Sequence, residues 1–197
     1  MLDPERNADM ETKKILKNLY DIFEVLATVT VAVTLLYAFG VRLQVVEGSS
    51  MRETLHDGER LLVSGLFYEP KRGDIVIIHK IDADPYDRPI VKRVIAVGGQ
   101  TVDIDFDKWE LRVDGEVVEE SYRWLDPDAH RTIVCEYELP VTLAEDEIFV
   151  MGDNRNGSAD SRTVQIGPVD KRCVVGRAFA RVAPLSEFML FENPFED

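Results

Sequence analysis

The longest apolar stretch of the chain, residues 25–41, lies close to its N-terminus and contains no charged side chain. A helix of this length spans roughly 26 Å, just short of the ~30 Å hydrocarbon core of a bilayer. The stretch is longer than the apolar part of a usual secretory leader, and no small-x-small cleavage pattern follows it. A core helix of a soluble domain would carry polar positions at helical spacing, whereas only threonines interrupt this stretch. The pattern therefore predicts a membrane anchor at 25–41.

Beyond the anchor, apolar positions recur in short β-like stretches separated by Gly, Pro and Asp. Such stretches are typical of strands, and the Asp114-Gly115 pair is a strong hairpin signal. The predicted strands are 60–63, 73–78, 90–97, the hairpin 111–118, 147–151 and 174–179. Residues 42–197 are therefore expected to form a mainly β domain with an antiparallel sheet. Within it, residues 104–144 are richer in charge and turns and are a possible small inserted subdomain.

The charges beside the anchor predict its orientation. Four basic residues precede the apolar stretch, namely Arg6, Lys13, Lys14 and Lys17. Because basic flanks favour the cytoplasmic side, we expect residues 1–24 in the cytoplasm and the bulk of the chain outside. The net charge of −14 argues against nucleic acid as a partner.

Cysteine and histidine are sparse. Cys135 and Cys173 are too few for a disulfide scaffold, and whether they pair stays open. His56, His79 and His130 show no metal-ligand spacing among themselves or with the cysteines, so no metal is expected.

Ser50 follows the apolar stretch by nine residues, which places a candidate nucleophile where the chain leaves a membrane. Most Gly-Ser-Ser triplets are simply turns, and a serine needs a base to become nucleophilic. None of the histidines has a persuasive context, although a membrane-anchored hydrolase that uses one of them stays open as an alternative.

Lys92 is the better candidate for the base. In the predicted strand 90–97, alternation puts Lys92 on the face of Ile90 and Val94, with Arg93 on the opposite face. One interpretation is a solvent-facing lysine on an edge strand. The other is a buried lysine whose pKa is lowered by desolvation. A lysine of ordinary pKa is neutral for only roughly 0.04% of the time at pH 7, and lowering the pKa by two units raises this to roughly 4%.

The loop 152–162 follows the apolar strand 147–151 and is rich in polar and charged side chains. Two Asp and two Arg residues are candidates to pair across the loop and hold it rigid: Asp153, Arg155, Asp160 and Arg162. Ser158 or Ser161 can then hydrogen-bond the lysine and orient it.

Taken together, four segments resemble the bacterial type I signal peptidases, in that family's order: 46–55, 71–76, 90–95 and 152–162. The resemblance implies Ser50 as nucleophile, Lys92 as general base and Ser158 as the residue that orients the lysine. It also implies the signal-peptidase fold with one N-terminal transmembrane helix, signal peptides of secretory preproteins as partners, and no cofactor.

The chain departs from that family at two positions close to the serine. Glu53 stands where proline is usual, and Gly48 stands where some members place a second hydroxyl for the oxyanion hole. The hole is therefore expected to depend mainly on the backbone N–H of Ser50. A catalytically silent relative that binds and positions exported chains is a further alternative, against which the presence of both Ser50 and Lys92 argues.

Overall fold

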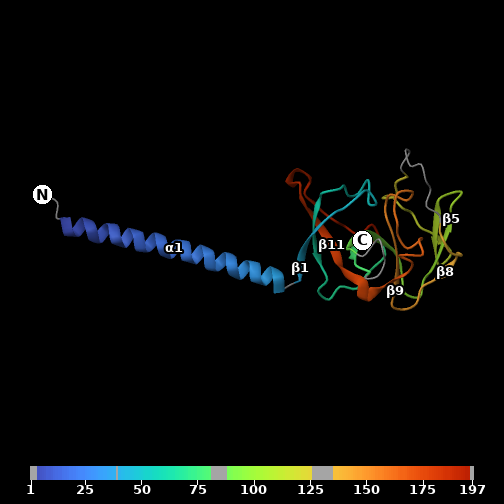
Figure 1. The fold of residues 1–197 in the computed structure, drawn as a ribbon, viewed down its shortest axis with the longest axis horizontal. Helices are drawn as coiled ribbons and strands as arrows, with labels where there is room; N and C mark the ends of the chain where they lie inside the picture. The colour runs from blue at the N-terminus through green and yellow to red at the C-terminus, as the bar shows by residue number, and fades with distance from the viewer. Residues whose placement is uncertain (1–3, 39, 81–87, 126–134, 196–197) are drawn as a thin grey trace. The chain divides into compact units, whose positions relative to one another are not determined.

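A computed structural model describes residues 4–38, 40–80, 88–125 and 135–195 of the chain (Figure 1). The chain divides into two compact units, Met1–Gly40 and Val41–Asp197, which are described separately.

The first unit is the helix α1 (Pro4–Ala38). Its segment Lys13–Leu35 is long and apolar enough to cross a membrane, with a mean hydropathy of 1.4, and none of that segment is buried. The helix begins upstream of the predicted anchor and ends at Ala38, three residues before the predicted end at Val41. Gly40 has a φ of +64°, which a helix cannot continue through and which suits glycine at a helix C-terminus.

Val41 belongs instead to the first strand of the second unit. The alternation Val41-Arg42-Leu43-Gln44-Val45 has the period of a strand, and these five residues pair antiparallel with residues 60–64.

The main sheet has eight strands, all of whose pairings are antiparallel. Its order is β1-β2-β11-β3-β4-β9-β10, and β12 pairs with β11. Two short 3-10 helices flank β11: η1 (Lys171–Cys173) and η2 (Leu185–Glu187). The strands are β1 (Val41–Val45), β2 (Arg60–Ser64), β3 (Ile75–Ile78), β4 (Ile90–Val97), β9 (Glu147–Met151), β10 (Val169–Asp170), β11 (Val174–Ala183) and β12 (Met189–Leu190).

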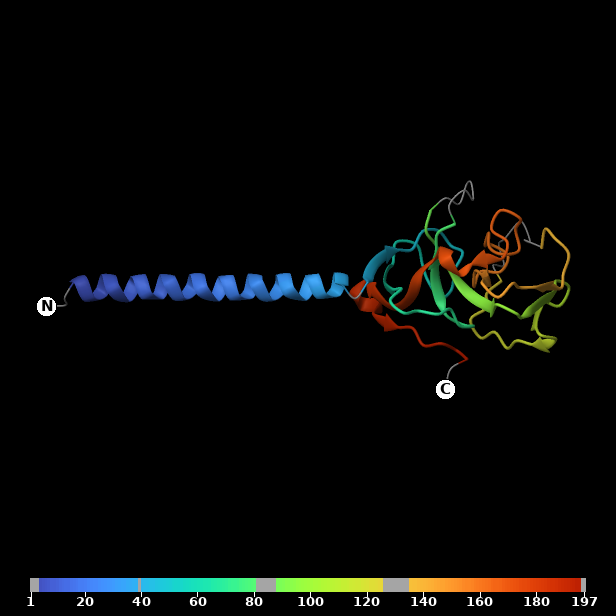
Figure 2. The ribbon, with the colours of Figure 1, turned by 90° about the horizontal axis from the view of Figure 1, so that it is seen from below.

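A second, four-stranded sheet has the order β7-β6-β5-β8. Its strands are β5 (Thr101–Asp105), β6 (Glu110–Val113), β7 (Glu116–Val117) and β8 (Val141–Thr142). The predicted hairpin is formed by β6 and β7, and Asp114 and Gly115 both have positive φ at its turn. In both views β5 and β8 lie at the end of the domain remote from β1 (Figures 1 and 2). The sheet draws mainly on the stretch 104–144 but begins earlier, at Thr101.

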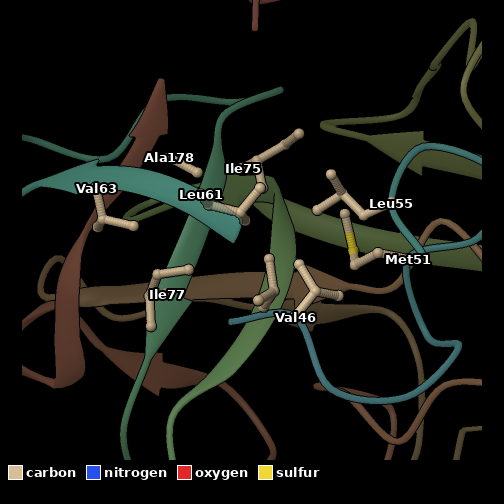
Figure 3. Packing of buried hydrophobic residues seen from close by; sticks show 9 residues of the cluster. Val46, Met51, Leu55, Leu61, Val63, Ile75, Ile77 and Ala178 are labelled. Atoms are coloured by element: carbon tan, nitrogen blue, oxygen red, sulfur yellow. The ribbon is translucent and has the colours of Figure 1, made fainter. Parts of the chain in front are cut away.

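The mainly β, antiparallel fold expected from the sequence is confirmed. Within it, β4 lies in the interior of the main sheet, between β3 and β9, and both of its faces are buried. One face carries Val91 into a cluster that also holds Leu61, Ile75, Met51 and Leu55; Figure 3 shows the last two side by side. The other face carries Val94 and Ile90 against a second cluster. A charged side chain on this strand is therefore buried whichever way it points.

Candidate active site

Ser50 and Lys92 meet although they are far apart in the chain. The Nζ atom of Lys92 lies 2.8 Å from the Oγ atom of Ser50 and 3.0 Å from the carbonyl oxygen of Val91. Lys92 is only 3% exposed, whereas Ser50 is half-buried and so accessible to a substrate. The interpretation of Lys92 as a solvent-facing lysine is wrong, because the side chain is buried and both faces of β4 are covered at this position.

Burial lowers the pKa of Lys92 to about 8. The surrounding charges act in both directions: Asp160 and Asp153 raise the pKa, and Arg162 and Arg88 lower it. With a pKa of about 8, roughly a tenth of the lysine is neutral at pH 7, against well under 0.1% at an ordinary pKa. A lysine in this state can accept the proton of a neighbouring hydroxyl.

The segment around Ser50 is held from both sides. Before the serine, the Val46 N–H donates to the Glu59 carbonyl at 2.8 Å. After it, Met51 and Leu55 are buried in the core cluster. The Arg52–Glu53 peptide bond, at the position where the resemblance predicts proline, is cis.

The loop after β9 fixes the serine directly. The Asn154 N–H donates to the Ser50 carbonyl at 3.1 Å, and the Asn154 side-chain amide donates to the Ser49 carbonyl at 3.1 Å. Gly152 allows this close approach, because a Cβ atom there would collide with the Ser50 carbonyl oxygen and with Ser158 Oγ. The Ser49-Ser50 backbone is thus held by the main chain and the side chain of Asn154, in the loop that also carries Ser158.

The four charged residues of the loop are all buried, but only two of them pair with each other. Arg162 binds both carboxylate oxygens of Asp160, at 2.8 and 2.7 Å. Burial by itself would raise the pKa of Asp160, but Arg162 and the Gly152 N–H, which donates to this carboxylate, lower it overall.

The other two loop residues pair outside the loop, which differs from the expected Asp–Arg pairing. Asp153 binds Arg93 of β4 at 2.8 and 2.7 Å and accepts from the Thr54 hydroxyl at 2.6 Å. Arg155 pairs with Glu120 from the stretch after β7. Asp153 turns to Arg93 because Arg93 projects from the face of β4 opposite to Lys92, where its buried charge needs a partner.

Ser158 is fully buried close to Ser50, the residue that forms a candidate catalytic dyad with Lys92. The Ser158 hydroxyl interacts with Asp160 and lies 3.5 Å from the Ala159 carbonyl. Among the described residues, Lys92 Nζ has its hydrogen bonds with Ser50 and Val91 and none with Ser158. The role of Ser158 in orienting the lysine therefore stays a prediction. Ser161 is directed elsewhere, because its Oγ atom accepts from the Val150 N–H at 2.9 Å.

A cavity of about 160 Å³ opens at the dyad. One wall is formed by residues 47–50 and the other by residues 88–92, with Gly157 and Ala159 completing the lining. The Ser50 N–H has no hydrogen-bond acceptor among the described residues, so it is available to a substrate carbonyl. The role of this N–H in an oxyanion hole stays a prediction.

Neither His56 nor His79 lines this cavity, and His130 lies outside the described residues. Within the described part of the chain no cluster of His, Cys, Asp or Glu has the arrangement of a metal site. Cys135 and Cys173 are both free thiols.

Several residues that support the site were missed at the level of sequence. Thr54 binds Asp153, Glu120 neutralises Arg155, and the Tyr122 ring lies 4.0 Å from the Arg93 guanidinium. Glu120 and Tyr122 lie in a charged, turn-rich stretch with no local pattern that points to the site. Arg93 could have been recognised from the sequence, because a charged side chain on a buried strand requires a partner of opposite charge.

Comparisons with known proteins relate the chain to one family. The sequence profile of the family described as signal peptidase, peptidase S26, matches residues 19–183. A signal peptidase I of Bacillus licheniformis is 39% identical over 187 residues, covering 89% of this chain and 91% of that protein. A signal peptidase I of Leptolyngbya laminosa is 32% identical over 171 residues, covering 80% and 78% respectively. Among solved structures, a signal peptidase I of Enterococcus faecalis is 28% identical, covers 56% of this chain and 97% of that chain, and has a TM-score of 0.42.

Proposed function

The chain belongs to the signal peptidase family, peptidase S26, and we propose that it is a membrane-anchored serine endopeptidase that removes signal peptides with Ser50 as nucleophile and Lys92 as base. The observation that carries the proposal is the 2.8 Å contact between Ser50 Oγ and a fully buried Lys92 Nζ.

The proposed reaction has two halves. Neutral Lys92 takes the proton of the Ser50 hydroxyl while Oγ attacks the carbonyl carbon of the scissile peptide bond. The Ser50 N–H donates to the oxyanion that forms. As the C–N bond breaks, protonated Lys92 gives its proton to the leaving amine, which leaves an ester on Ser50. Water, deprotonated by neutral Lys92, then attacks this ester, and the lysine returns the proton to Ser50 Oγ.

The substrate is proposed to bind as an added strand along β4. β9 pairs with β4 only from Arg93 onward, so residues 90–92 have no strand partner among the described residues on that side, where they line the cavity. An extended peptide can hydrogen-bond this edge with its carbonyl next to Ser50. Small side chains at the first and third positions before the cut fit the limited volume of the cavity.

The anchor is part of the same proposal: the uncharged stretch of α1 from Val25 onward lies in the bilayer, and residues 1–24 lie on the cytoplasmic side. An apolar row across four strands supports a place near the membrane. Leu43, Leu62, Ala180 and Leu190 are cross-strand neighbours and therefore share one face, and Leu43 and Leu190 are more than half exposed. Protease protection of tags placed at each end of the chain, in sealed vesicles, tests the orientation.

Cleavage of a purified preprotein in detergent tests the dyad. Ser50→Ala and Lys92→Ala are expected to abolish cleavage, while Ser49→Ala, which removes the neighbouring exposed hydroxyl, retains it. Near-ultraviolet circular dichroism establishes that each variant is folded. Full activity in folded Ser50→Ala or Lys92→Ala would contradict the dyad, and loss of activity on replacing His56 or His79 would favour the histidine alternative.

The pH profile tests the role of Lys92 independently. A base with a pKa of about 8 is protonated and inactive below that pH, so activity is expected to rise through pH 8 and level off above it. A flat profile between pH 6 and 9 would contradict a lysine base.

A further inference from the structure

An ion pair spans the two walls of the active-site cavity. Arg88 Nη1 lies 2.7 Å from Glu47 Oε2, and each side chain is 59% exposed. Glu47 belongs to the wall that carries Ser50, and Arg88 belongs to the wall that carries Lys92. Neither side chain takes part in the proton transfers proposed for Ser50 and Lys92, although the charge of Arg88 contributes to lowering the pKa of Lys92.

The position of the pair relative to the cut follows from the chain. Glu47 precedes Ser50 by three residues and Arg88 precedes Lys92 by four. Because Glu47 contacts Arg88 and Ser50 contacts Lys92, the two walls run in the same direction. Residues 48–50 bend, and Gly48 has a φ of +81°, so the pair lies at most roughly 10–13 Å along the groove from Ser50 and Lys92. Consider a substrate peptide whose scissile carbonyl lies at Ser50 and whose acyl half lies in the cavity. Its fourth and fifth residues before the cut then lie at the pair.

We propose that Glu47 and Arg88 determine specificity at the fourth and fifth substrate positions before the scissile bond, by selecting for uncharged side chains there. This rests on the proposed function. With the two charges satisfied by each other, an uncharged side chain passes without breaking the pair. A charged substrate side chain must displace one partner, and it leaves the other partner facing a like charge.

Removing either partner reverses part of this selection. Without Glu47, the Arg88 guanidinium is free to bind an acidic side chain. Without Arg88, the Glu47 carboxylate is free to bind a basic one. Because both side chains are well exposed, each effect is expected to be about twofold to fivefold in kcat/KM.

Peptide cleavage by the full chain in detergent tests the proposal. The substrates carry alanine at the first and third positions before the cut and Gln, Lys or Glu at the fourth or fifth. Wild type is expected to prefer Gln. Relative to the Gln peptides, Glu47→Gln is expected to cleave the Glu peptides better than wild type does. Arg88→Gln is expected to cleave the Lys peptides better than wild type does. The double exchange E47R/R88E is expected to keep the wild-type order of preference among the peptides, because the ion pair is restored. Asp105→Ala and Lys108→Ala, which break an exposed ion pair outside the cavity, are expected to keep it too.

The proposal is overturned if Glu47→Gln and Arg88→Gln rank the peptides as wild type does. Failure of the proposed function gives a different result, because wild type would then cleave none of the peptides, including the Gln peptides, or Ser50→Ala would cleave them all.

Discussion

A buried lysine with a lowered pKa costs stability, and this cost can be measured by replacing Lys92 with methionine. Methionine keeps the apolar stem of the side chain and removes the ammonium group. The native state of the wild type holds the Lys92 proton less tightly than the unfolded chain does, because burial disfavours the charged form. The free energy of unfolding of the wild type therefore rises with pH between the native and the unfolded pKa of Lys92. In that range the unfolded chain still binds the proton and the native state has lost it.

The magnitude follows from the two pKa values, about 8 in the native state and 10.5 in the unfolded chain. The cost to the wild type is about 3 kcal/mol at pH 7 and falls to about 1 kcal/mol at pH 9.5. Lys92→Met is therefore expected to be more stable than wild type at pH 7, although inactive. The advantage is expected to shrink by about 2 kcal/mol between pH 7 and 9.5. Losing the hydrogen bonds with Ser50 and Val91 changes the absolute difference but not its dependence on pH.

Urea unfolding of the full chain in a non-denaturing detergent, followed by the fluorescence of Trp109 and Trp124, gives the free energy of unfolding at each pH. Lys108→Met, at an exposed lysine, is the matched control and is expected to show almost no pH-dependent difference from wild type. A difference between Lys92→Met and wild type that stays constant from pH 7 to 9.5 would refute the argument that Lys92 is desolvated.

Three further substitutions test the surroundings of the dyad. Asp153→Asn leaves the buried charge of Arg93 without its partner and is expected to lower the free energy of unfolding by about 3–5 kcal/mol, measured in urea. Gly152→Ala pushes a methyl group against the Ser50 carbonyl and is expected to lower kcat by about 10²-fold with the fold retained by circular dichroism; unchanged kcat would contradict the close approach. Asp160→Asn removes a charge that raises the pKa of Lys92 and leaves Arg162, which lowers it, so the midpoint of the pH–activity profile is expected to move below about 8. A midpoint that stays in place would show that Asp160 does not act on the lysine.

The sequence was sufficient for the elements whose signals are local. The end of the apolar stretch, predicted at Val41, lies three residues beyond the end of α1 at Ala38, and the Asp114-Gly115 turn joins β6 and β7 as predicted. The alternation around Lys92 predicts its side chain on the face of Ile90 and Val94, and these two residues do share one cluster. These signals are local because side-chain periodicity and turn chemistry depend on neighbouring residues.

The contacts that bring the site together are not local, and the sequence could not supply them. Asp153 and Arg155 were expected to pair across the loop with the other charged residues of 152–162, but they bind Arg93 and Glu120 instead. Nothing near Glu120 indicates that it meets Arg155, because this pairing depends on how the second sheet packs against the first. The short strands β8, β10 and β12 have two residues each, too few to show a period.

The register of β4 links the structural residues to the proposed chemistry. A slip of one residue would exchange the faces of Lys92 and Arg93 and remove the base from Ser50. Arg93 opposes such a slip, because its guanidinium binds both oxygens of Asp153, donates to the Gly73 carbonyl at 2.8 Å and lies over the Tyr122 ring. A bidentate, buried pair of this kind has a strict geometry that Lys92 cannot reproduce. Arg93 is thus the chain neighbour of the proposed base, and its contacts with Asp153, Gly73 and Tyr122 oppose a slip that would move Lys92 away from Ser50.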